Sequence, residues 1–243
     1  MKYINKFKLL PVLIILILST CSCNKYLDKQ PLDAITSEAF FETATQINQA
    51  LTGVYNAYGA RTISPGFSNP TTYYAKMDLY TEIGLERSLN GTIGSGAYGT
   101  TNGSVAEIWA AFFQVIQRSN SLLFNMPKAQ SVMSPVDYAR VQAEAKILRA
   151  LAYWHLITYF GDVPFFTGPL AQSDVYAATR KPKKDIINFL ITDVEAASSA
   201  LAWLPTETGR VSRGVALGAA ARLAMLDKRY ADVIRLTDNV IAN

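Results

Sequence analysis

Cysteine and histidine are almost absent from this chain of 243 residues, which has two cysteines and one histidine. Both cysteines, Cys21 and Cys23, lie near the N-terminus, so the rest of the chain has no thiol for a disulfide or a cysteine-rich metal site. The histidine, His155, lies in an apolar stretch with helical spacing, and no G-x-S-x-G nucleophile motif occurs. We therefore expect no catalytic residue, no metal site and no cofactor.

Long runs of like charge are also lacking. The chain has 23 lysines and arginines against 19 aspartates and glutamates, which gives a net charge of +4. Lys2, Lys6 and Lys8 fall in the N-terminal segment, and without them the balance is 20 against 19. Because no basic block remains that could follow phosphates, we expect no nucleic-acid partner.

The N-terminus has the layout of an export signal. A basic start is followed by an apolar run from Leu9 to Leu18, which is shorter than the roughly 20 residues that a membrane-spanning helix needs. This layout indicates a secretory signal peptide. Since the apolar run leads to a cysteine, we predict a lipoprotein signal peptide over residues 1–22, after which the cysteine thiol is acylated and becomes the first residue.

Of the two cysteines, Cys23 is the better candidate for the lipid anchor. The small residue Ser22 precedes Cys23, whereas the β-branched Thr20 precedes Cys21. The alternatives are acylation of Cys21, or a plain signal peptide whose cysteines are incidental or form a disulfide that strain disfavours at this spacing. We predict a fatty acid such as palmitate on Cys23 and a lipidated linker over residues 23–35.

Helical patterns dominate the rest of the chain, and strand patterns are nearly absent. Thr43 and Gln46 form a capping box at one helix start. Ser104 begins a second capping box, and Ser134 precedes a proline at a third helix start. Apolar residues at helical spacing follow these starts. The predicted helices cover residues 43–59, 104–127, 135–160, 182–205 and 213–243, the last of them broken at 227–229.

Alanine-rich stretches indicate how these helices pack. In "GVALGAAARLAML", residues 214–226, small side chains let a neighbouring helix approach closely, and Tyr230 is expected to fill the groove beside it. No strict repeat period can be counted. We therefore predict an all-α fold of irregular tetratricopeptide-like helical hairpins, with a long, glycine-rich loop inserted over residues 61–103.

The stretch "AEAKILRALAYWHLITYFGDVPFF", residues 143–166, closely resembles the signature helix and turn of the SusD/RagB-like outer-membrane lipoproteins of Bacteroidetes. Further stretches resemble family blocks in the same order: "CNKYLDKQP", "EIWAAFFQVIQRSNSLL" and "KKDIINFLITDVEAASSALAWLP". The resemblance implies that residues 36–243 form the helical-repeat domain of the N-terminal part of the family. Family members are generally at least twice this long, so we expect this chain to lack their C-terminal half.

The resemblance also implies a function. A member of this family is expected to be a surface-exposed lipoprotein of the cell outer membrane, attached to the membrane by its N-terminal lipid. It binds a nutrient, commonly an oligosaccharide, and passes it to a partner, a SusC-like TonB-dependent transporter. A second hypothesis is a helical scaffold lipoprotein that docks on a transporter without binding glycan of its own.

Candidate ligand contacts lie in the inserted loop. Sugar rings need flat apolar faces, and we predict that Tyr73, Tyr74 and Tyr98 provide them. The alternative is that these tyrosines pin the loop to the body of the protein. The three tryptophans have apolar neighbours at helical spacing and are expected to pack in the core.

An enzyme is a third hypothesis. Asp78, Glu82 and Glu86 are spaced so that they share one helix face, and paired carboxylates can cleave glycosidic bonds. Carboxylates at this spacing usually form a solvated face, so we expect no enzymatic activity.

Overall fold

The computed structural model describes residues 40–60, 99, 103–170, 172–205 and 207–243. The predicted signal peptide, the predicted linker and most of the predicted inserted loop lie outside this part of the chain. So do the residues of the predicted sites, namely Cys23, Tyr73, Tyr74, Tyr98 and the three acidic residues of the loop. Phe41–Asn243 forms a compact unit of its own.

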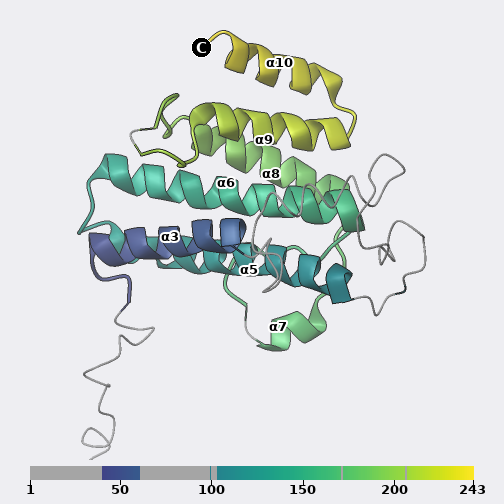
Figure 1. Cartoon of the computed structure of the whole chain (residues 1–243), viewed down its shortest axis with the longest axis horizontal. Helices are drawn as coiled ribbons and strands as arrows, with labels where there is room; N and C mark the ends of the chain where they lie inside the picture. Colours follow the sequence, from purple (N-terminus) through teal and green to yellow (C-terminus); the bar gives the residue numbers. More distant parts are fainter. Residues whose placement is uncertain (1–39, 61–98, 100–102, 171, 206) are drawn as a thin grey trace, which may run out of the picture. The chain divides into compact units, whose positions relative to one another are not determined.

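The described residues form α-helices and no β-strand, apart from one isolated bridge between Val163 and Lys181. Figure 1 shows the order of the elements. They are α3 (Ala44–Ala60), α5 (Gly103–Asn125), the 3₁₀-helix η2 (Met126–Ala129), α6 (Pro135–Phe160), α7 (Gln172–Ala177), α8 (Lys183–Ser198), α9 (Arg213–Leu226) and α10 (Tyr230–Ile241).

The long helices stack as three consecutive pairs: α3 with α5, α6 with α8, and α9 with α10 (Figure 1). The first helix of each later pair packs on both helices of the preceding pair, because α6 contacts α3 and α5 while α9 contacts α6 and α8. This is the stacking of a tetratricopeptide-like array. The prediction of an all-α fold of irregular helical hairpins is confirmed.

Helix α6 lies at the centre of this stack, in contact with α3, α5, α8 and α9. Its sequence is apolar on most sides, so that burial on most sides is what the hydrophobic effect favours. The predicted start is confirmed, since Ser134 accepts a hydrogen bond from the backbone N–H of Asp137 and Pro135 occupies the first helical position. At its other end Gly161 adopts a positive φ of 68°, which a glycine takes without steric cost.

Other helix ends follow the sequence signals closely. The capping box before α3 forms as predicted: Gln46 N–H donates to Thr43 Oγ1 (3.2 Å) and Thr43 N–H donates to Gln46 Oε1 (3.0 Å). Helix α5 begins at Gly103, one residue before the predicted cap, Ser104. The break between the last two helices falls at Asp227–Arg229, where Lys228 has a positive φ of 57°.

Two expectations about the last helices are wrong. Helix α8 ends at Ser198 and not near Pro205, and the backbone N–H groups of Ala200 and Leu201 then donate to carbonyls three residues back, which closes the helix with a tighter turn. Tyr230 does not fill a groove, since it is 57% exposed, and Leu236 is instead the buried side chain of α10.

Buried polar side chains form hydrogen bonds with the turn that follows α6. The Tyr153 hydroxyl accepts a hydrogen bond from Phe166 N–H (2.7 Å) and donates to Phe166 C=O (3.2 Å). Arg149, also buried, donates to Asn120 Oδ1 of α5 (2.8 Å) and to Asp193 Oδ2 of α8 (2.8 Å). One helix, its two neighbours and the following turn are thus held by two side chains of α6.

Replacing Tyr153 by Phe is expected to lower the free energy of unfolding by about 1–3 kcal/mol, because it leaves the backbone groups of Phe166 without their partner. Urea denaturation measures this change. Tyr230→Phe is the matched control and is expected to have little effect, since the hydroxyl is removed from an exposed ring. Equal losses in the two variants would contradict this account of the turn.

Candidate functional site

The predicted ligand-binding loop joins the described fold at one end of α6. Helix α3 ends at Ala60 and α5 begins at Gly103, so the two roots of the loop are the ends of these helices. Near the first root, the Tyr58 hydroxyl lies 3.4 Å from Nε2 of His155. Near the second root, Trp109 packs edge-on against Phe160, with 5.0 Å between ring centroids.

Aromatic rings gather on this end of α6. His155 stacks on Phe112 of α5 (centroids 4.5 Å apart) and meets the ring of Trp154 edge-on (4.6 Å). Tyr159 lies 6.0 Å from His155 and is 36% exposed. Phe112, Trp154, His155 and Tyr159 thus form a packed group of rings, here called the aromatic wall, in which Tyr159 is partly exposed. It lies next to the helix ends that the predicted ligand loop connects.

The tryptophans are less buried than the sequence suggested. Trp109, Trp154 and Trp203 are all half-buried, and none belongs to the enclosed core. Arg222 lies over the ring of Trp154, and Arg213 lies over the ring of Trp203, each with 5.2 Å from guanidinium carbon to centroid. Trp154 and Trp203 therefore do not pack in the core as expected. Each of them instead packs beneath an arginine.

His155 is buried, as the apolar sequence around it predicts. Burial lowers the pKa of His155 to about 4, and the positive charge of Arg222 contributes to this shift. The imidazole is therefore neutral at pH 7. It is a component of the aromatic wall and not a charged group.

Acidification should weaken the fold through His155. The unfolded chain binds this proton with a pKa near 6.5 and the folded chain only near 4, so the unfolded state is favoured as the pH falls below about 6.5. Between pH 7 and pH 4 we expect a loss of up to about 3 kcal/mol in the free energy of unfolding from this residue. His155→Gln should show a shallower loss than wild type in urea denaturation at pH 7 and pH 4.5. Identical losses in the two proteins would exclude this role.

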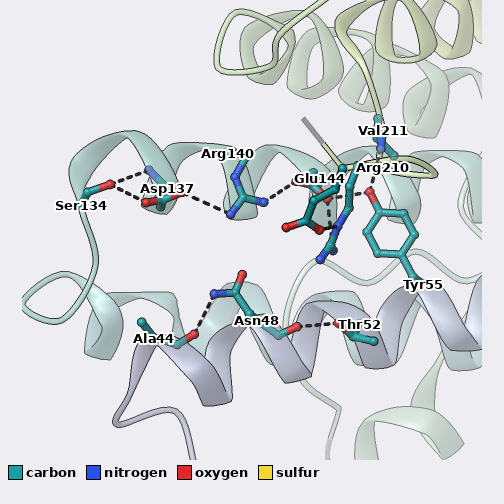
Figure 2. A network of polar contacts seen from close by, with 11 residues as sticks. Ala44, Asn48, Thr52, Tyr55, Ser134, Asp137, Arg140, Glu144, Arg210 and Val211 are labelled. Atoms are coloured by element: carbon teal, nitrogen blue, oxygen red, sulfur yellow. Dashed lines mark hydrogen bonds and ion pairs between the residues drawn. The ribbon is translucent and has the colours of Figure 1, made fainter. Parts of the chain in front are cut away.

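A second site lies towards the other end of α6. A cavity of about 350 Å³ opens between the first half of α6 and the connection from α8 to α9. Five of its lining residues are charged: Asp137, Arg140, Glu144, Glu207 and Arg210. Figure 2 shows the polar network that Asp137, Arg140, Glu144 and Arg210 form with Tyr55 of α3.

The Glu144 carboxylate is the centre of this network (Figure 2). Its side chain is 1% exposed. It accepts hydrogen bonds from the Tyr55 hydroxyl (2.6 Å) and from Arg140 Nη1–H (2.7 Å), and Arg210 Nη1 lies 3.7 Å from it. Because these contacts satisfy both of its oxygens, the carboxylate is stable in a buried position.

Tyr55 connects this carboxylate to the connection between α8 and α9. Its oxygen accepts a hydrogen bond from Val211 N–H (2.9 Å), and the Arg210 guanidinium lies over its ring at 5.2 Å. Burial raises the pKa of the Tyr55 phenol, and the hydrogen bond to Glu144 adds to the rise. The phenol therefore stays protonated and remains a donor to Glu144.

Each arginine of the cavity also has an exposed carboxylate three residues before it. Arg140 Nη2 lies 3.3 Å from Asp137 Oδ1, and Arg210 Nε donates to Glu207 Oε2 at 2.8 Å. A hydrogen bond from Ser134 holds the pKa of Asp137 below its ordinary value, with a further contribution from Arg140. The hydrogen bond from Arg210 does the same for the pKa of Glu207.

No motif in the sequence predicts this cavity. Its one available signal was Glu144, an acidic residue flanked by Ala143 and Ala145 in a helix that is apolar on most sides. Such a residue needs a partner. The partners come from positions as distant as Tyr55 and Arg210, and nothing in the local sequence indicates them.

The described residues contain neither a metal site nor a membrane-spanning helix. No group of three or more His, Cys, Asp or Glu side chains is arranged to hold a metal ion there. Within the same ranges, no helix combines the length and the apolar character that crossing a membrane requires.

Comparison with known proteins identifies the family. A family model described as "Starch-binding associating with outer membrane" matches residues 25–225. The chain belongs to the SusD-like family. It is similar to SusD-like protein P25 of Formosa agariphila, with 27% identity over 230 residues that cover 90% of this chain and 43% of that protein. The chain thus spans less than half the length of the curated relatives that it matches.

Solved structures of SusD-like proteins have the same fold. A SusD-like carbohydrate-binding protein from Bacteroides fragilis superposes with a TM-score of 0.72 at 21% identity, over 84% of this chain and 41% of that one. A laminarin-binding SusD-like protein superposes with a TM-score of 0.68 at 23% identity, over 82% and 43% of the two chains. At these identities the likeness establishes the helical fold.

Proposed function

We propose that this SusD-like chain is a surface-exposed, lipid-anchored module of the outer membrane that binds a glycan and passes it to a SusC-like TonB-dependent transporter. The observation that carries the proposal is the family match over residues 25–225, whose description joins starch binding with the outer membrane. The likeness to proteins named for carbohydrate or laminarin binding supports a glycan as the ligand.

The proposed mechanism is capture and hand-over, without making or breaking a covalent bond. Glycoside hydrolysis needs a carboxylic acid that stays protonated until it donates to the leaving oxygen. In the cavity, the pKa values of Asp137 and Glu207 are lowered by their hydrogen bonds, which is the opposite of what a general acid needs. Incubation with mixed polysaccharides is therefore expected to release no new reducing ends.

In this proposal, residues 1–22 are a signal peptide, residues 23–35 are a lipidated linker, and residues 36–243 are the helical-repeat domain. The acyl chains on Cys23 supply the membrane affinity, since each buried CH₂ contributes about 0.8 kcal/mol and more than one chain gives stable attachment. The helical stack then needs no apolar surface of its own for membrane binding.

Replacing Cys23 by Ala should leave the chain without acyl groups and move it out of the membrane fraction. Cys21→Ala is the matched control and should stay acylated. Mass spectrometry of the N-terminal peptide and fractionation of the expressing cells measure both effects. Acyl groups on Cys21, or a mature chain with none, would contradict the assignment.

Replacing Tyr73, Tyr74 and Tyr98 together by Ala should weaken retention of the chain in native gels that contain laminarin or starch, because stacking faces for sugar rings are lost. Tyr230→Ala, which removes an exposed tyrosine of α10, should leave retention unchanged. If the wild-type chain is not retained by any polysaccharide tested, the alternative of a scaffold that docks on a transporter without binding glycan is favoured.

A further inference from the structure

The cavity beside Glu144 is lined by charged groups of both signs. Its lining carries two guanidinium groups, which only donate hydrogen bonds, and three carboxylates, which only accept them. They alternate in space, because Glu144 lies between the two arginines while Asp137 and Glu207 flank them on the solvent side. Any ligand that enters the cavity therefore contacts positively charged hydrogen-bond donors and negatively charged acceptors side by side.

The presence of both arginines and carboxylates disfavours the binding of charged ligands. An anion could bind Arg140 and Arg210 but would face three carboxylates at close range, and a cation would meet the two arginines. A hydroxyl group both donates and accepts. Neighbouring hydroxyls on one ring can accept from an arginine and donate to a carboxylate without displacing any ion pair.

The arginines have capacity for such a ligand. Each guanidinium has five N–H donors. The contacts to Glu144, Asp137 and Glu207 occupy only some of these donors in each arginine. Arg140 and Arg210 are also partly exposed, at 31% and 20% of their side chains. Their remaining donors are within reach of the cavity.

The rest of the lining is apolar. Val136, Leu201 and Pro205 face the cavity, and these side chains can pack against the C–H surface of a sugar ring. A volume of about 350 Å³ lies at the small end of the range for ligand pockets, which suits a single ring better than an extended chain.

We propose that this cavity is a subsite for one neutral polyhydroxyl ring, such as a terminal sugar residue, held between Arg140, Arg210 and the carboxylates that flank them. The inference rests on the proposed function and adds to it a saccharide contact outside the inserted loop. The buried Glu144–Tyr55 pair positions the two arginines, while Asp137 and Glu207 accept from the ring hydroxyls.

The test uses the full chain and small probes of one ring each. Saturation-transfer NMR with the methyl glycosides of glucose, galactose, mannose and xylose should detect binding of at least one of them. Glucuronate and glucosamine, which carry opposite charges on similar rings, should bind about tenfold more weakly than the best neutral probe. Stronger binding of either charged ring would overturn the proposal, as would the absence of a signal from all four neutral probes.

Two variants separate a ligand role from a structural one. Ala202→Trp places a large side chain at an exposed position of the lining and should abolish the signal. The double variant Asp137→Asn, Glu207→Gln removes two negative charges from exposed positions and should shift the preference towards glucuronate by about tenfold. Unchanged binding in the first variant, or unchanged preference in the second, would overturn the subsite.

The glycan function itself is tested separately, by retention of the wild-type chain in polysaccharide gels. If the wild-type chain and the Ala202→Trp variant are both retained in the gels, but the wild-type chain gives no signal with any neutral glycoside, the subsite is excluded and the proposed function stands. Asp238→Asn, a neutralising change at an exposed position of α10, is the control for charge and should alter neither measurement.

Discussion

The burial of α6 on most of its sides is the constraint on which the rest of the structure depends. A helix in contact with α3, α5, α8 and α9 cannot leave a polar side chain without a partner, because the cost of an unpaired buried group is comparable to the stabilisation of several contacts. The buried polar residues of α6, Glu144, Arg149 and His155, must therefore each be matched by a neighbouring element.

Each of these residues binds a different part of the molecule. Glu144 joins α3 to the connection between α8 and α9 through Tyr55 and Arg210. Arg149 joins α5 and α8. His155 packs against rings of α3 and α5. Polar pairing thus fixes the relative positions of helices that apolar packing alone would hold less specifically.

The same helix separates two regions that could meet a ligand. The cavity lies by Glu144, whereas the aromatic wall at the roots of the inserted loop lies by Tyr159, about 20 Å further along the helix axis. A rigid central helix would hold both regions at a constant spacing. In the proposed function, an extended glycan is long enough to contact both regions, whereas a single ring can contact only one.

The sequence by itself determined the long helices, although not the end of α8 or the short helix α7. Capping residues such as Thr43 and Ser134, the glycine after α6 and apolar residues at helical spacing act within one or two turns, so the helices and the all-α class could be predicted, and the signature stretch indicated the family. Tertiary structure decided the rest. The partial exposure of Trp154 beneath Arg222, the exposure of Tyr230 and the cavity around Glu144 depend on which distant segments pack together. Tyr55 and Arg210 meet one carboxylate only because α3 and the connection between α8 and α9 both pack against α6, and no local pattern encodes that contact.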